Sequence, residues 1–366
     1  MSKEKAWTIL TDLLSVQSIT GERSDEVIRV VAEHLDENNI SYRIHKFEDK
    51  KDKEKVYYAL SAEKGTQDNA ITFICHLDVV NPATKEQWDW KRDGDTIIGR
   101  GVADAKGPAS MVIQAFIDVD VSSLENKLRL FVTTDEEIGG FNGAKPLFEM
   151  HQSSEADFAV AIEPVGKIIT KFFGVLRFSI EIVNEESHTK TGNLNAINTY
   201  RELSQRIQVY LHSLGKDETL GFSLYNPTFI SSGDKAGDGT NPGFAYAKVD
   251  IRVIPSINPD DLHQKIVDIA RVLEKECKLK DLSARITVEK TISGPSLFAD
   301  VNHPYVKKLQ ALGHEMGFSR GSSDAKWATC PAVEFGPQGQ DIHGPNERIR
   351  LSDLYTFYDD LMKFLK

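Results

Sequence analysis

The amino-acid sequence predicts an α/β protein that carries a second, inserted α+β domain. Up to about residue 165, apolar runs typical of strands alternate with amphipathic helical segments, which is the pattern of a sheet covered by helices on both faces. Between about 170 and 290 the order changes to strand, helix, strand, strand, helix and strand, a unit large enough to fold as its own domain. A chain of 366 residues is also too long for one ordinary core.

The first part of the chain contains the alternating helices and strands. The run over 69–80 is almost continuously apolar, as expected of a strand buried on both faces. The helical segments instead show apolar residues at intervals of three and four. Helices are predicted over 1–19, 24–40 and 105–119, and strands over 55–62, 69–80, 127–134 and 157–164.

The rest of the chain divides into the β-α-β-β-α-β unit and a closing segment. In the unit, strands are predicted over 172–183, 222–232, 243–255 and 284–291, and helices over 194–214 and 259–277. The closing segment contains a predicted helix over 303–317, a short strand over 331–337 and a final helix over 351–366. We therefore predict that 1–169 and 293–366 form one domain and that 170–292 form an inserted, ferredoxin-like domain.

Composition and charge disfavour several classes of partner. The net charge of −11 argues against a nucleic-acid or anionic-membrane partner, but not against metal cations. The basic, then apolar N-terminus is interrupted by Thr11 and Asp12, so it predicts an amphipathic helix and not a secretion signal. No apolar run approaches the roughly 18 residues that span a bilayer. The three cysteines have no metal-like spacing and fit a reducing compartment, so we expect a cytoplasmic protein.

Acidic and imidazole side chains follow several of the predicted strands. His76 and Asp78 stand two apart at the end of a buried strand, so both side chains leave the same face. In open α/β sheets ligands bind beyond the carboxyl ends of the strands, and we expect the acidic and imidazole groups to converge there. The other candidates are Asp104 in GRGVADAKGP, the cluster Asp135, Glu136 and Glu137 in TTDEEIGG, Glu163 in AIEP, and His343 in QDIHGPNE.

Each of these features alone has an ordinary structural explanation. A histidine at a strand end is more often structural than a ligand, an aspartate in a turn is usually a cap or turn former, and adjacent glutamates are usually solvated. Two histidines and several carboxylates that converge from separate segments are harder to explain in this way. Neutral imidazole and carboxylate are a common ligand set for Zn²⁺, with Co²⁺ or Mn²⁺ also possible. A cation would also compensate the three neighbouring carboxylates.

Five motifs, HLDVV, GRGVADAKG, TTDEEIGG, IEP and FGPQGQDIHGPNE, resemble those of the M20 family of co-catalytic metallopeptidases and deacylases, and they occur in the same order. That family includes succinyl-diaminopimelate desuccinylase, acetylornithine deacetylase, aminoacylase and the glutamate carboxypeptidases. The resemblance extends from the first helix to the last and covers the inserted domain. It implies a zinc-peptidase-like mixed sheet with helices on both faces, an inserted lid and dimerisation domain, and two Zn²⁺ per subunit.

The resemblance also implies a ligand set. His76 and Glu163 match the ligands of one metal ion, and Glu137 and His343 match those of the other. Asp104 matches the carboxylate that bridges both ions. The bridge makes physical sense, because two cations roughly 3.5–4 Å apart need a shared anion between them.

Two further residues match the groups that assist the metal ions. Glu136 matches the general base, and Asp78 matches the carboxylate that holds the ring of His76 and raises its basicity. The metal ions would lower the pKa of a bound water from about 15.7 towards 7. Glu136 would then take the proton during attack on an amide carbonyl and deliver it to the leaving amine.

Five positions are candidates for substrate contact. His188 in ESHTKTGNLNA resembles a histidine of the inserted domain that reaches the active site of the other subunit and helps stabilise the oxyanion; the alternative is a surface histidine. Asn241 and Arg252 resemble a pair that binds the substrate carboxylate, a task suited to a forked guanidinium, although Arg252 could be a surface arginine. Ser323 and Asp324 in RGSSDAKW resemble a loop that lines the pocket.

The chain departs from the family pattern at a few places. Ala105 follows Asp104 where many relatives have a second acid or a methionine, and we expect the metal site to survive this change. The segments VNEESHTK and GTNPGFA differ from the usual sequences around the lid histidine and lid asparagine. These two differences affect the expected substrate preference more than the expected catalysis.

Three functions are compatible with these observations. The first is a dinuclear-metal hydrolase that removes an acyl group or a C-terminal residue from a small N-acyl amino acid; Glu163 favours it by resemblance, since dipeptidases and tripeptidases tend to carry aspartate there. The second is a dipeptidase or other short-peptide peptidase. The third is a metal-free binding or scaffold protein, which is disfavoured because the ligands and the base are all present. We expect a homodimer through the inserted domain, whose strands could extend a sheet across a two-fold axis.

Overall fold

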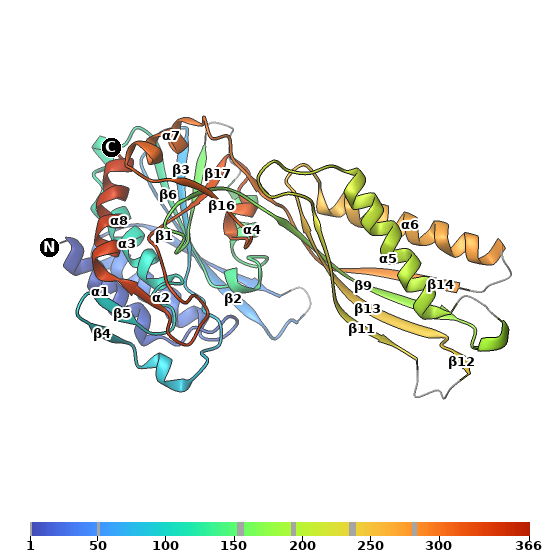
Figure 1. Cartoon of the computed structure of the whole chain (residues 1–366). Coiled ribbons are helices and arrows are strands. Elements are labelled where there is room, and N and C mark those ends of the chain that lie inside the picture. The colour runs from blue at the N-terminus through green and yellow to red at the C-terminus, as the bar shows by residue number, and fades with distance from the viewer. Residues whose placement is uncertain (1, 50–51, 152–156, 192–194, 234–238, 280–283) are drawn as a thin grey trace. The chain divides into compact units, whose positions relative to one another are not determined.

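The computed structural model describes residues 2–49, 52–151, 157–191, 195–233, 239–279 and 284–366. The chain forms two compact units (Figure 1). The first unit comprises Met1–Lys171 and Leu297–Lys366, and the inserted unit comprises Phe172–Ser296. Within the described ranges, no helix has the length and hydrophobicity needed to cross a bilayer.

The first unit is built on a mixed sheet to which nine of the described strands contribute, in the order β1-β2-β6-β3-β7-β17-β8-β15, with β16 paired to β8. The central strands β6, β3, β7 and β17 are parallel, whereas the strands on both sides of them are antiparallel. Every residue of β3, β7 and β17 is buried, which explains their continuous apolar runs. The strands are β1 (Tyr42–Glu48), β2 (Val56–Lys64), β3 (Ala70–His76), β6 (Lys127–Thr133), β7 (Phe158–Ile162), β8 (Ile168–Phe172), β15 (Leu297–Phe298), β16 (Met316–Ser319) and β17 (Ala332–Phe335).

Helices cover both faces of this sheet. One core joins the sheet to the first three helices and to α7 and α8. On the opposite face, α4 packs Phe148 against Phe131 of β6, with ring centroids 5.3 Å apart. Figure 1 shows α4 on the other side of the strands from α1, α3 and α8. The helices are α1 (Ser2–Ser15), α2 (Ser24–Glu37), α3 (Lys106–Asp118), α4 (Ala144–Met150), α7 (Pro304–Ala311) and α8 (Leu351–Phe364).

A small three-stranded sheet links distant parts of the first unit. It has the order β18-β5-β4, with β4 (Lys91–Asp93), β5 (Thr96–Ile98) and β18 (Arg348–Arg350). The backbone N–H of Gly99 also donates to the carbonyl oxygen of Glu347 at 3.0 Å. This pairing holds the segment before α3 beside the segment before α8.

The inserted unit is a four-stranded antiparallel sheet with two helices on one face. The strand order β11-β13-β9-β14, with connections through α5 and α6, is that of a β-α-β-β-α-β unit. Apolar side chains that alternate along β9 and β13 form its core against the helices. A separate ribbon pairs β10 with β12. The elements are β9 (Gly174–Asn184), β10 (Ser187–His188), α5 (Ala196–Ser213), β11 (Leu224–Ser232), β12 (Thr240–Asn241), β13 (Phe244–Val253), α6 (Pro259–Leu279) and β14 (Ala284–Gly294).

The predicted fold class is confirmed: a mixed sheet with helices on both faces is accompanied by a ferredoxin-like unit. Helix α4, the strands β1, β8 and β16, and six strands of two or three residues were not predicted from the sequence. The sequence analysis also placed a helix over 303–317, whereas α7 ends at Ala311. Gly313 adopts a left-handed conformation, with φ of +99°, which ends the helix and lets the chain turn into β16.

Candidate metal centre

The candidate metal ligands lie at the edge of the large sheet where its parallel strands end. His76 is the last residue of β3, and Glu163 directly follows β7. Glu137 lies in the short 3₁₀ helix after β6, Asp104 precedes α3, and His343 lies between β17 and β18. Parallel strands end at the same edge of a sheet, so this topology brings together residues that are far apart in the sequence.

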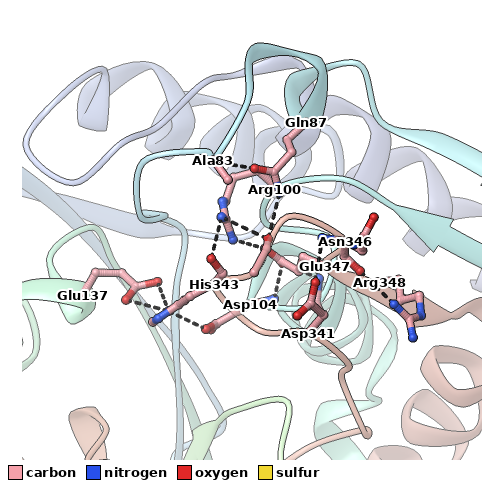
Figure 2. A network of polar contacts seen from close by, with 12 residues as sticks. Ala83, Gln87, Arg100, Asp104, Glu137, Asp341, His343, Asn346, Glu347 and Arg348 are labelled. Carbon is pink, nitrogen blue, oxygen red and sulfur yellow. Dashed lines mark hydrogen bonds and ion pairs between the residues drawn. The ribbon is translucent and has the colours of Figure 1, made fainter.

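Asp104 faces the imidazole rings of both His76 and His343, and Figure 2 shows its contact with His343. Its Oδ1 is 3.1 Å from Nε2 of His76, and its Oδ2 is 3.2 Å from Nε2 of His343. The same nitrogen of His343 is 3.1 Å from Oε1 of Glu137. His76, Asp104 and Glu137 each offer a ligand atom, and these three atoms lie within 4.8 Å of one another. Two neutral imidazoles and carboxylates at this spacing fit a divalent metal ion, and the two oxygens of Asp104 face different rings.

Glu163 and Glu136 add two buried carboxyl groups beside this cluster. Burial raises the pKa of Glu163 well above its usual value, and the carboxylate of Glu136 raises it further. Burial also raises the pKa of Glu136, while the ring of His76 opposes the shift. A Cβ at Gly336 would lie 2.1 Å from the backbone oxygen of Glu163, so the close passage of these two segments requires glycine. A buried surplus of carboxylates is an environment that a bound cation relieves.

The two histidines respond to the same carboxylates. Burial opposes a charge on His76, but hydrogen bonds to Asp104 and Asp78 raise its pKa well above the usual value. Hydrogen bonds to Asp104 and Glu137 raise the pKa of His343 to about 10. Burial opposes the charge on Asp104, but the bonds from His343 and His76 lower its pKa. Metal binding must therefore displace protons from both rings, because only neutral imidazole is a ligand.

Asp78 fixes both the ring of His76 and the acidic turn. Nδ1 of His76 donates to the backbone oxygen of Asp78 at 3.0 Å and lies 3.4 Å from its carboxylate. That bond directs Nε2 of the neutral ring towards Asp104. The carboxylate oxygens of Asp78 also accept from the backbone N–H groups of Glu136 and Glu137, each at 3.2 Å, and from the Thr20 hydroxyl at 2.8 Å. One carboxylate thus positions a strand and a turn at the same time.

The sequence analysis assigned no role to two buried groups beside the cluster. Arg100 and Glu347 form an ion pair whose side chains are fully buried. Lys106 is also buried, and its ammonium donates to the backbone oxygens of Leu13 at 3.1 Å and Val16 at 2.6 Å. Burial lowers the pKa of Lys106 to about 7. The charged residues stood within glycine-rich motifs, GRGVADAKG and GPNE, and that context could have indicated that they are buried.

Ser323 and Asp324 lie in the interior of the first unit. Only 2% of each residue is exposed. Asp324 accepts from the Thr133 hydroxyl at 3.1 Å, and the Ser323 hydroxyl accepts from the N–H of Ala325 at 3.3 Å. Burial raises the pKa of the neighbouring Glu334 to about 7, and a hydrogen bond with Ser323 opposes the shift. Contact of Ser323 and Asp324 with a substrate stays a prediction.

The remaining candidates belong to the inserted unit. His188 is exposed on β10, and Asn241 stands on β12, the partner strand of the ribbon. The side-chain amide of Asn241 donates to the hydroxyl of Ser187 at 3.0 Å. Arg252 is half-buried on β13, and its Nε lies 3.0 Å from a carboxylate oxygen of Asp250. The ribbon thus brings His188 and Asn241 together, whereas Arg252 stands on the neighbouring sheet.

Comparison with known proteins matches most of the chain to one family. Residues 72–366 match peptidase family M20/M25/M40. The succinyl-diaminopimelate desuccinylase of Rickettsia felis is 26% identical over 382 residues, an alignment that covers 97% of this chain and 98% of the relative. The candidate ligands and Glu136 all lie within the matched residues.

Solved structures share the fold at low sequence identity. A tripeptidase from Staphylococcus aureus superposes with a TM-score of 0.71 and 18% identity, and the alignment covers 100% of this chain and 98% of that one. A dinuclear metal-binding peptidase of the M20 family from Bacillus subtilis gives a TM-score of 0.68 and 15% identity, with 99% and 98% covered. At these identities the likeness establishes the fold.

Proposed function

The chain belongs to peptidase family M20/M25/M40 and is a metal-dependent hydrolase of amide bonds, and we propose that it acts with two divalent ions, Zn²⁺ in the first instance. His76 and Glu163 would hold one ion, Glu137 and His343 the other, and Asp104 would bridge them. The observation that carries this proposal is the placement of Asp104, whose two oxygens lie 3.1 and 3.2 Å from imidazoles of two distant segments. Co²⁺ or Mn²⁺ would suit the same donors.

When bound, the ions would supply Lewis acidity, which would polarise the amide carbonyl and lower the pKa of water so that it becomes a better nucleophile. Glu136 is the proposed general base. Its backbone is fixed by Asp78, and its carboxylate can accept a proton. Glu136 accepts the proton of the attacking water as the carbon–oxygen bond forms. It then delivers that proton to the nitrogen as the carbon–nitrogen bond breaks, which yields a carboxylic acid and an amine.

The proposed substrate is a small N-acyl amino acid. Support comes from the desuccinylase relative, which aligns over nearly the full length of both chains. Arg252 and Asn241 would bind the carboxylate of the substrate, and His188 would stabilise the oxyanion. The alternative is a dipeptidase or short-peptide peptidase on the same scaffold.

A homodimer through the inserted unit is part of the proposal. The strand β11 lies at an edge of its sheet and exposes Leu224, Phe229 and Ile230. An exposed apolar edge strand favours pairing with another strand, and a second copy of the chain would supply one. His188 would then act in the site of the partner subunit. Rescue of activity on mixing a His188→Ala chain with a Glu136→Gln chain would support this action, and absence of rescue would contradict it.

The test combines metal analysis, a substrate panel and one variant. Protein purified without chelator should contain two divalent ions per chain, and N-acetyl and N-succinyl amino acids should be hydrolysed faster than dipeptides. Glu136→Gln should keep both ions and lose about 10²–10⁴-fold in kcat. A metal-free protein, or an active Glu136→Gln variant, would contradict the proposal. A clear preference for dipeptides would favour the alternative substrate class.

A further inference from the structure

A buried ion pair lies behind the candidate ligands Asp104 and His343 (Figure 2). The guanidinium of Arg100 pairs with the carboxylate of Glu347, and their side chains are 1% and 0% exposed. Neither residue is a candidate ligand or base. Arg100 comes from the segment that leads to Asp104, and Glu347 comes from the end of the loop that carries His343.

The contacts of this pair cross from one segment to the other. Oε1 of Glu347 accepts from the backbone N–H groups of Ala103 and Asp104, each at 3.1 Å. Nη2 of Arg100 donates to the backbone oxygens of His343 at 3.1 Å and Gly344 at 3.4 Å. The glutamate from the His343 loop therefore holds the turn of Asp104. The arginine from the Asp104 segment holds the loop of His343.

The loop that these bonds restrain has an unusual backbone. Asp341 and His343 adopt the left-handed region, with φ of +52° and +61°, although neither is glycine. Such conformations are strained for residues other than glycine and persist where the surroundings over-determine them. Two further bonds act on this loop: Gln87 Nε2 donates to the oxygen of Gly344 at 2.9 Å, and Asp341 Oδ2 accepts from the N–H of Asn346 at 2.7 Å. The His343 ring thus depends on bonds to its backbone for its position.

Net stability is a poor explanation for such a pair. Desolvation of two charges offsets much of their attraction. Replacement of a buried ion pair by apolar residues of similar volume therefore often leaves a core equally stable or more stable. A planar guanidinium and a carboxylate do offer fixed geometry, because each directs several hydrogen bonds at once. In this unit those bonds end on the backbones of two candidate ligands.

We propose that Arg100 and Glu347 form a positioning clamp that sets the separation of Asp104 and His343 and thereby the affinity for the metal ion between Asp104, Glu137 and His343. The inference rests on the two-ion function proposed above. The other ion depends less on the clamp, because His76 ends a buried strand and is held by Asp78. Residues that orient metal ligands typically contribute 10–100-fold to metal affinity.

The experiment titrates chelator-treated protein with Co²⁺ and follows binding by calorimetry and visible absorption. Arg100→Met removes the bonds to the His343 loop, and Glu347→Gln keeps an acceptor for Asp104 but loses the charge. The matched controls are Arg129→Met and Glu63→Gln, which break an ion pair of 2.6 Å in the same unit between β6 and β2. Gln87→Ala removes the bond to Gly344, together with the bonds that Gln87 accepts from Ala83 and Thr84, and leaves the ion pair intact, so it tests a milder perturbation.

Wild-type protein and both controls should each bind two Co²⁺. For each binding step, the affinity and the visible spectrum of the controls should match those of wild type. Arg100→Met and Glu347→Gln should bind one ion within about threefold of wild type and the other about 10–100-fold more weakly. Gln87→Ala should show a smaller loss in the same step. The thermal stabilisation that saturating metal gives should fall in the clamp variants but not in the controls, which separates positioning from general destabilisation.

Equal affinities in wild type and in all folded variants would overturn the clamp and leave the two-ion function standing. An equal loss of affinity in both binding steps would overturn the claim that the clamp acts mainly on the ion beside His343. Wild-type protein that binds no Co²⁺ would overturn the two-ion function and the clamp with it. If Arg100→Met and Glu347→Gln do not fold, Arg100→Lys takes their place, because it keeps the charge beside Glu347 but loses the fork that reaches His343 and Gly344. Unchanged Co²⁺ binding by Arg100→Lys would then overturn the clamp.

Discussion

His76 and His343 present the same ring atom, Nε2, to the two oxygens of Asp104, but the structure supports the two rings in opposite ways. His76 ends a strand in the middle of the sheet, and its side chain is 1% exposed. His343 stands in a loop at φ of +61°, and its side chain is 49% exposed. The sheet positions the first ring, whereas side-chain bonds to the loop backbone position the second.

This difference indicates that one candidate metal position is rigid and the other is adjustable. A ligand on a buried strand moves only if the sheet moves, because interiors are closely packed. A ligand on a loop can be displaced at small cost unless specific bonds hold it. We therefore expect the ion on the His343 side to exchange more readily. Variants that affect both metal positions, or only the one beside His76 or His343, test this comparison.

The largest effect is expected for Asp104→Ala, which removes the group that both sides share. Loss of the bridge should abolish stable binding of both ions and lower kcat/KM by about 10³-fold or more, which corresponds to about 4 kcal/mol. Metal content and kcat/KM provide the measurement, and Asp120→Ala, at an exposed cap, is the control. An Asp104→Ala variant that retains two ions and a tenth of the activity would contradict the proposed bridging role of Asp104.

The two histidine variants should differ in stability. His76→Ala removes a buried ring that pairs with the carboxylates of Asp104 and Asp78, so chelator-treated protein should lose about 3 kcal/mol of unfolding free energy. His343→Ala removes a half-exposed ring and should cost less than about 1 kcal/mol. Urea unfolding of both chelator-treated variants gives the comparison. Equal losses would show that strand and loop support the rings alike.

Asp78→Asn should weaken the binding of both metal ions to an intermediate degree. The amide of asparagine cannot accept on both of its atoms, so at least one bond to His76, Glu136 or Glu137 is lost. Metal affinity and kcat/KM should fall about 10–100-fold while the overall stability changes little. Thr20→Val removes only the hydroxyl bond to Asp78 and serves as the milder control. A fully active Asp78→Asn variant would contradict the proposed support.

The last variant tests a pH dependence of stability at Glu334, a residue that is neither a candidate ligand nor the proposed base. Burial raises its pKa to about 7, so between about pH 4.5 and 7 the folded protein keeps a proton that the unfolded chain releases. Unfolding free energy from this group therefore falls as pH rises through that window. Relative to wild type, the unfolding free energy of Glu334→Gln should rise by up to about 3 kcal/mol between pH 4.5 and 7, measured by urea unfolding at each pH. A pH-independent difference would show that Glu334 is ionised in the fold.

Sequence reasoning predicted the parts of this molecule that follow from local pattern. Continuous apolar runs located β3, β6 and β7, and the parallel pairing of β3 with β7 places His76 and Glu163 at one edge. It missed β1, whose residues are mostly exposed, and β8 and β16, which depend on pairing with distant strands. Propensity is weakest where tertiary pairing decides the structure.

The same limit applies to the candidate site. The ligands carry chemistry that their residue types reveal, but Arg100 and Glu347 act through bonds to backbone atoms of distant residues. Their residue types alone are those of an ordinary surface. Likewise, Ser323 and Asp324 stand in a loop-like sequence, yet tertiary packing buries them. Burial of a polar side chain follows from the whole fold and not from the local pattern.

Anomalous diffraction at the zinc edge, from crystals grown with Zn²⁺, tests the meeting of the five candidate ligands most directly. The account predicts two anomalous peaks per chain on either side of the Asp104 carboxylate, one beside His76 and Glu163 and one beside Glu137 and His343. Peaks elsewhere on the chain, with none beside Asp104, would contradict it.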